Sequence, residues 1–125
     1  MNLVDSSGWL EFLSDGPKAS QFEKSLLDLD HLIVPSICIY EVFKVVLRER
    51  GEDDALQAAA LMKQGKVVDL TEEIALEAAR LSFELKIPMA DSIVLATGRR
   101  YEATIWTLDQ DFQDLPGVKY IPKSR

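Results

Sequence analysis

Apolar residues recur at helical spacing along much of the chain. The clearest helix is predicted over residues 36–50, and Gly51 follows it as a typical helix-ending residue. The apolar positions of this segment follow the i, i+3, i+4, i+7, i+8 pattern of a buried stripe and are Ile39, Val42, Phe43, Val46 and Leu47. Thr71 is placed to cap a later helix. Together these patterns predict helices over residues 9–13, 18–29, 36–50, 53–63, 71–86 and 90–101.

Short apolar runs separate these helical segments and predict strands. They are Leu3–Val4 and residues 32–34, 66–70, 104–107 and 118–121, the last being the weakest. Strands that alternate with helices are typical of an α/β fold, in which a parallel sheet carries helices on both faces. We therefore expect a central sheet of four to five parallel strands, with residues 1–125 forming a single domain.

Composition narrows the function. The chain has 125 residues, a formal net charge of −7 and one cysteine, Cys38, which cannot form an internal disulfide. A single cysteine fits the reducing cytoplasm, and neither a membrane span nor a signal peptide is expected. Net acidity disfavours binding of nucleic acid by bulk charge. That argument weakens where carboxylates surround divalent cations, because a bound metal reverses the local field.

Four carboxylates fall where a parallel sheet places its ligands. Asp5 follows the first strand and Asp109 follows the strand that ends at Thr107. Glu41 lies on the long helix, and Asp91 lies in the first turn after Pro88. Because strand ends and the starts of the next helices meet at one edge of the sheet, we expect these acids to converge. Such a cluster suits Mg²⁺ or Mn²⁺, which prefer oxygen ligands and can activate water beside a phosphate.

Each acid also has an ordinary structural explanation. Asp5 and Asp91 are both placed to stabilise the start of a helix. Asp109 fits a turn, and the neighbouring Asp111 fits the same role. The hypothesis of a metal site therefore depends on the joint spacing of the four acids.

Cationic side chains near these segments have two explanations as well. Glu41 can pair with Lys44 or, one turn further, with Arg48 on the same helix. Lys44, Arg48, Arg99 and Arg100 are also the candidates for contacts with substrate phosphates, although solvated surface positions explain them equally well.

Three other side chains are weighed as functional groups. His31 is the only histidine and can act as a general base, but a single histidine at the start of a strand is more often structural. Trp9 and Trp106 can stack on bases, but core packing is the simpler expectation.

Each acid belongs to a short sequence motif. The four motifs are Leu3-Val4-Asp5-Ser6-Ser7, Pro35-Ser36-Ile37-Cys38-Ile39-Tyr40-Glu41-Val42, Ala90-Asp91-Ser92-Ile93-Val94-Leu95-Ala96-Thr97 and Thr107-Leu108-Asp109-Gln110-Asp111-Phe112. They resemble the motifs of the PIN-domain family, and within it of the small VapC-type toxins of toxin–antitoxin pairs. Each motif is weak alone, but the four occur in the family's order across nearly the whole chain.

The resemblance implies a PIN-like fold and Mg²⁺- or Mn²⁺-dependent endoribonuclease activity on single-stranded RNA. It also implies a homodimer and a cognate antitoxin protein that blocks the site. The acids that carry over as catalytic metal ligands are Asp5, Glu41, Asp91 and Asp109. Ser7 and Thr107 match hydroxyl positions that support them. Gly98-Arg99-Arg100 departs from the pattern, since many relatives are more apolar there.

Two other classes of function remain open. One is a different acidic-site α/β enzyme, such as a phosphatase or a phosphotransfer domain. A haloacid-type phosphatase would carry a second Asp two residues after Asp5, where this chain has Ser7. The other is a catalytically idle PIN-fold module that binds RNA or a protein partner without cleaving. Retention of all four acids argues against that loss of activity.

Overall fold

The computed structural model describes residues 1–123 and shows one five-stranded parallel sheet in the order β3-β2-β1-β4-β5. The strands are β1 (Asn2–Val4), β2 (Leu32–Pro35), β3 (Lys66–Val68), β4 (Thr104–Thr107) and β5 (Val118–Tyr120). The helices are α1 (Ser6–Leu13), α2 (Ala19–Leu27), α3 (Ser36–Arg50), α4 (Glu52–Met62), α5 (Glu72–Leu85) and α6 (Met89–Arg100). Two short 3₁₀ turns, η1 (Leu29–His31) and η2 (Gln110–Phe112), precede β2 and follow β4.

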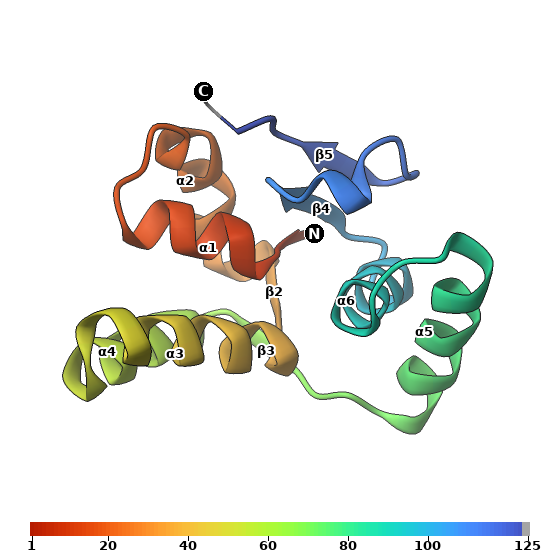
Figure 1. Cartoon of the computed structure of the whole chain (residues 1–125), viewed down its shortest axis with the longest axis horizontal. Helices are drawn as coiled ribbons and strands as arrows, with labels where there is room; N and C mark the ends of the chain where they lie inside the picture. Colours follow the sequence, from red (N-terminus) through yellow and green to blue (C-terminus); the bar gives the residue numbers. More distant parts are fainter. Residues whose placement is uncertain (124–125) are drawn as a thin grey trace.

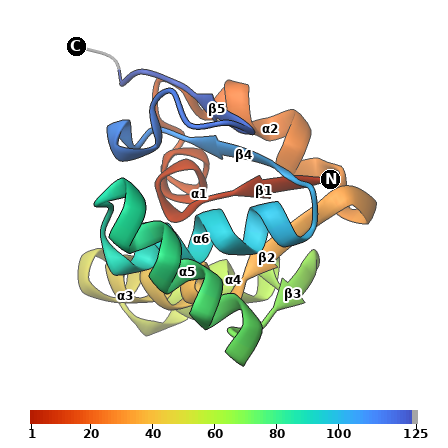
Figure 2. The same ribbon diagram turned by 90° about the vertical axis from the view of Figure 1, so that its right-hand side faces the viewer.

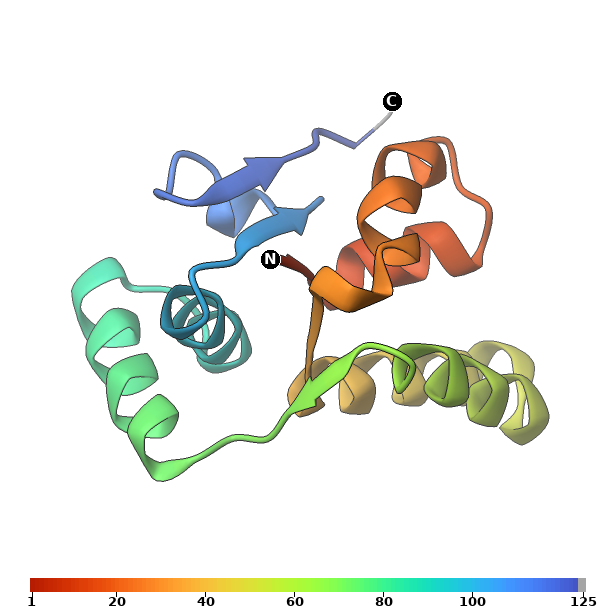
Figure 3. The same cartoon turned by 180° about the vertical axis from the view of Figure 1, so that it is seen from behind.

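Helices cover the sheet on both faces, as the alternating pattern predicts. The pairs α1–α2 and α3–α4 lie on one side, and α5–α6 lies on the other (Figures 1 and 3). The chain moves outward from β1 through β2 to β3, and then returns across the sheet to β4 and β5. With right-handed crossovers, this reversal places the two groups of helices on opposite faces.

The middle strand, β1, is short and completely enclosed. It lies between β2 and β4 (Figure 2). Leu3 lies opposite both Ile33 and Ile105. These three side chains are almost completely buried. A strand covered on both faces reads as a continuous apolar run, which explains why Leu3–Val4 is recognisable from so few residues.

Helix α6 packs unusually close to the sheet at Gly98. A Cβ placed there would lie 2.6 Å from Cδ1 of Ile105 on β4. The residues of α6 from Ser92 to Gly98 are all buried, so this helix is nearly surrounded. The apolar run that continues the third motif therefore packs α6 against the sheet.

The predicted elements are confirmed in number, type and order. Helix α1 starts at Ser6 with Asp5 as its cap, as the capping explanation of Asp5 predicts. In α3 the predicted stripe is partly wrong, since Leu47 is 43% exposed. None of the helices within residues 1–123 is both long and apolar enough to cross a bilayer.

Candidate metal-binding site

The predicted acids lie at the carboxyl edge of the sheet, around the point where the strand order reverses. Asp5 directly follows β1, and Asp109 follows β4, its neighbour. Glu41 lies on α3 after β2, and Asp91 lies in the first turn of α6. In open α/β sheets, ligands bind at this reversal of strand order.

Asp5 is buried and held by three donors. The hydroxyl of Ser7 donates to Oδ1 at 2.6 Å, and the backbone N–H of Gly8 donates to the same oxygen at 3.1 Å. The hydroxyl of Thr107 donates to Oδ2 at 2.5 Å. Asp5 is only 4% exposed and is the N-cap of α1. The capping role considered for Asp5 from the sequence is therefore confirmed, and the same residue also lies beside the other acids.

The two hydroxyl side chains also join the loops that follow β1 and β4. Thr107 accepts from the backbone N–H of Asp109 at 2.9 Å, and Ser7 accepts from that of Leu108 at 3.0 Å. The two hydroxyl oxygens are themselves 3.3 Å apart. Ser7 and Thr107 thus fix the position of Asp5 relative to Asp109, across about a hundred residues of sequence.

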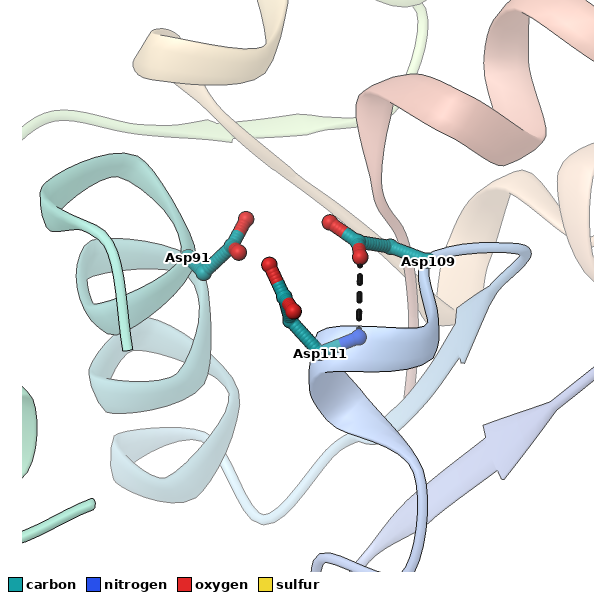
Figure 4. A group of neighbouring side chains, drawn as sticks. All are labelled: Asp91, Asp109 and Asp111. Atoms are coloured by element: carbon teal, nitrogen blue, oxygen red, sulfur yellow. Dashed lines mark hydrogen bonds between the residues drawn. The ribbon is translucent and has the colours of Figure 1, made fainter. Parts of the chain in front are cut away.

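Asp91, Asp109 and Asp111 form an open cluster at the surface. One carboxylate oxygen from each lies within 4.8 Å of the others, and the three side chains turn toward one shared space (Figure 4). Asp109 also accepts from the backbone N–H of Asp111 at 2.9 Å, which closes the η2 turn. The sequence left the role of Asp111 undecided. Its spacing of two from Asp109 gave no sign that a 3₁₀ turn brings both carboxylates to Asp91.

The acids perturb one another, which shows that they share one field. Burial, together with the charges of Asp109 and Asp111 and smaller contributions from Asp5 and Glu41, raises the pKa of Asp91 to about 7. Crowding of like charges is costly unless a cation or a proton neutralises it.

The pKa values of Glu41 and Asp5 are raised as well, and burial is the largest cause in each case. Burial raises the pKa of Glu41, the Ser6 side chain opposes that rise, and the charges of Asp5 and Asp109 add to it. Burial also raises the pKa of Asp5, although its hydroxyl and N–H donors lower it. All four predicted acids therefore interact electrostatically, although only Asp91 and Asp109 belong to the open cluster.

The residues present fit a hard divalent cation. The donors are carboxylate oxygens, which Mg²⁺ and Mn²⁺ prefer. Among residues 1–123, no lysine, arginine or histidine forms an ion pair with the carboxylates of the open cluster. The protein thus provides the negative charge and the oxygen atoms but no positive side chain to balance them.

The cationic candidates divide into two groups. Lys44 and Arg48 lie one and two turns beyond Glu41 on α3. Within residues 1–123, neither forms an ion pair with Glu41, and Arg48 pairs with Glu49 at 3.2 Å. Arg99 and Arg100 lie in the last turn of α6, about 12 and 14 Å along the helix from Asp91 by the rise per residue. The structure therefore does not bring Arg99 and Arg100 to the acidic cluster.

The remaining candidates are structural. His31 is exposed, precedes β2 at the opposite edge of the sheet, and contacts Asp28 at 3.0 Å. Trp9 is buried, and the indole N–H of Trp106 donates to Asn2 at 3.0 Å. Cys38 is completely buried, and burial raises its pKa well above the ordinary value, with Asp5 and Glu41 adding to the rise. A neutral thiol thus lies close to the acids.

Comparison with known proteins identifies the family. The sequence matches the family described as PIN domain over residues 3–118. A search of the curated proteins gives no significant match.

Several solved structures share the fold. A toxin–antitoxin complex from Klebsiella pneumoniae aligns with a TM-score of 0.80 at 22% identity, covering 95% of this chain and 96% of that one. VapC20 from Mycobacterium tuberculosis, described as a sarcin–ricin loop cleaving toxin, gives 0.75 at 18% identity, covering 90% and 92%. A DNA-bound VapBC from Salmonella typhimurium gives 0.77 at 14% identity, covering 98% of each chain.

Proposed function

The chain belongs to the PIN-domain family, and on that premise we propose that it is a Mg²⁺- or Mn²⁺-dependent endoribonuclease that acts in the cytoplasm as the toxin of a toxin–antitoxin pair. The observation that carries the proposal is the open cluster of Asp91, Asp109 and Asp111, whose oxygens lie within 4.8 Å of one another. Asp5 and Glu41 act on the same cluster electrostatically. A site of this charge suits a divalent cation and the phosphate oxygens that the cation would bind.

The residues divide the work of hydrolysis. Asp91, Asp109 and Asp111 would hold the cation, with Glu41 and Asp5 completing its negative surroundings. When bound, a divalent cation supplies an activated water and stabilises the charge that develops on the phosphate. Ser7 and Thr107 keep Asp5 in one orientation by donating to both of its oxygens. Fixed ligands preserve alignment during in-line attack, which is a large part of catalysis.

The neighbour from M. tuberculosis supports the nuclease proposal, since its description names cleavage of the sarcin–ricin loop. We extend only the class of reaction to this chain, which is cleavage of an RNA phosphodiester bond.

A cognate antitoxin is the proposed protein partner, because the K. pneumoniae structure is described as a toxin–antitoxin complex. This chain offers a groove of about 670 Å³ between α1, α3 and α4. Its apolar wall includes Leu10, Leu13 and Val46, and Glu49 and Arg50 lie among its polar residues. That lining suits the apolar face of an amphipathic helix. A basic side chain on the same partner would reach the carboxylates and neutralise them.

A homodimer is proposed through the outer surface of α5. Phe83 on that helix is 85% exposed, and Met89 at the start of α6 is 71% exposed. Large apolar side chains exposed together are typical of a protein interface. Light scattering of the full chain and of Phe83→Ser tests this, and a monomeric wild-type chain would refute it.

The nuclease proposal is tested with single-stranded RNA, with and without Mn²⁺, in the presence or absence of EDTA. We expect internal cleavage with Mn²⁺ and none with EDTA. Asp5→Asn should abolish cleavage while keeping the far-ultraviolet circular dichroism of the wild type. Cleavage that persists after complete chelation would overturn the metal mechanism.

The idle-module alternative makes the opposite prediction in the same assay. Such a protein would bind RNA with Mn²⁺ present and leave it intact.

A further inference from the structure

One exposed stripe of α3 carries an aromatic ring and cations beside the acidic site. Tyr40, Lys44 and Arg48 recur every four residues, so they lie on one side of the helix. Tyr40 is 61% exposed, although it is a large aromatic residue. The ammonium of Lys44 lies 5.8 Å from the centre of the Tyr40 ring. That distance falls within the range of a cation–π contact.

This stripe borders the site directly. Tyr40 immediately precedes Glu41, and adjacent helical residues point about 100° apart. Glu41 is half-buried, and its pKa responds to the charges of Asp5 and Asp109. Tyr40 is exposed on the neighbouring side of the helix, so it lies at the rim of the site.

Lys44 is a cation at this rim that can contact a substrate phosphate. Within residues 1–123, no acid lies within ion-pair distance of Lys44, whereas Arg48 pairs with Glu49. The chain carries a net charge of −7, and its open cluster adds local negative charge. A polyanionic substrate therefore needs a positive contact close to the site, outside the carboxylates themselves.

We propose that Tyr40 and Lys44 form a nucleotide-binding subsite at the rim of the acidic site. The Tyr40 ring stacks on a base next to the cleaved phosphate, and the Lys44 ammonium contacts a phosphate of the same strand. The inference rests on the proposed nuclease function and names how its substrate is held. Stacking on an aromatic ring requires an unpaired base, so this subsite selects single-stranded RNA.

The first test compares Tyr40→Leu with Tyr40→Phe, using a single-stranded RNA oligonucleotide and Mn²⁺. Both variants keep an apolar side chain, but only Phe keeps a ring that stacks. We expect Tyr40→Leu to raise KM about tenfold with little change in kcat, and Tyr40→Phe to match the wild type. Equal KM values for Leu and wild type would overturn the proposal. So would a changed oligomeric state in Tyr40→Leu, because the ring would then be covered by another protein chain.

The second test measures the salt dependence of RNA binding for Lys44→Gln. Loss of one phosphate contact should lower the slope of log K against log salt by about 0.7 for a single strand. Lys24→Gln on α2, also exposed, is the matched control and should leave the slope unchanged. An unchanged slope in Lys44→Gln would contradict the proposed contact between Lys44 and a phosphate.

The two proposals fail differently. If the wild-type chain neither binds nor cleaves RNA, the nuclease function fails and the subsite fails with it. If the wild type cleaves RNA and the Tyr40 and Lys44 variants match it, only the subsite fails.

Discussion

Asp5 and the open cluster carry the same chemical group in two opposite environments. Asp5 is 4% exposed, and both of its oxygens accept hydrogen bonds from Ser7, Gly8 and Thr107. Within residues 1–123, the carboxylates of the open cluster accept a single hydrogen bond, from the backbone N–H of Asp111 to Asp109. Asp91 accepts no side-chain or capping hydrogen bond among residues 1–123.

The difference lies in how far hydrogen bonds oppose the effect of burial on each carboxylate. Hydrogen bonds to a carboxylate favour its ionised form. Burial raises the pKa of Asp5, but its three donors oppose that rise. The pKa of Asp91 rises to about 7, and no such donor in the described part of the chain opposes the rise. The following predictions test that contrast, beginning with the largest expected effect.

Asp91→Asn should remove most of the activity without unfolding the protein. Loss of a residue that supports a metal ligand costs about 10- to 100-fold, so loss of a ligand should cost at least about 100-fold in kcat/KM. Because the substitution relieves repulsion, the midpoint of thermal unfolding in EDTA at neutral pH should stay level or rise. Asp53→Asn on α4 is the exposed control. Near-normal activity in Asp91→Asn would show that Asp91 is not a metal ligand.

Thr107→Val should lower both the free energy of unfolding and the activity, because the hydroxyl makes two hydrogen bonds. The change keeps the shape of the side chain but removes the donor to Asp5 and the acceptor for the N–H of Asp109. Unsatisfied buried groups of this kind cost about 1–3 kcal/mol of unfolding free energy. Activity should fall by about 10- to 100-fold through misplaced ligands. Thr107→Ser, which keeps the hydroxyl, should recover most of both losses. Urea denaturation and cleavage kinetics measure the two effects.

Stability of the metal-free protein should fall as pH rises from about 4 to about 7. The pKa of Asp91 is raised from 3.8 to about 7 in the folded protein. Between these values the folded state binds more protons than the unfolded state, so rising pH favours unfolding. Asp5 and Glu41 shift in the same direction.

Mn²⁺ should reverse this loss, and its stabilising effect should be larger at pH 8 than at pH 5, since the ligands must be deprotonated. Thermal unfolding followed by circular dichroism, in EDTA and in Mn²⁺, measures both trends. A higher unfolding temperature in EDTA at pH 8 than at pH 5 would contradict the assigned electrostatics.

Asp111→Asn should have the smallest effect. Asp111 is exposed, so its charge is better solvated than that of Asp91. We expect apparent Mn²⁺ affinity to weaken by about tenfold or less, with kcat nearly restored at saturating metal. Titration of cleavage against Mn²⁺ measures this. A loss as large as that of Asp91→Asn would place both carboxylates equally close to the chemistry.

The sequence predicts the fold and the convergence of the four acids for simple reasons. Helical spacing and short apolar runs are local signals, and a parallel sheet collects strand ends at one edge. Asp5 and Asp109 were predictable because each directly follows such a run.

The rest depends on tertiary geometry that no local pattern contains. Asp111 joins the cluster through the η2 turn, and Leu47 is exposed although it belongs to the predicted apolar stripe of α3. Arg99 and Arg100 looked available in sequence but lie at the far end of α6. Helical spacing gives their distance from Asp91, but the orientation of α6 in the fold is not contained in the local sequence.

The central position of β1 has a consequence for how the protein folds. Residues 2–4 form the middle of the sheet, but one of their two neighbours is β4, at residues 104–106. Contacts between such distant parts of a chain form slowly. The loop of Asp5 therefore meets Asp109 only once a pairing that spans about a hundred residues has formed. A folding intermediate that lacks the β1–β4 pairing would contain most of the helices without the assembled group of acids.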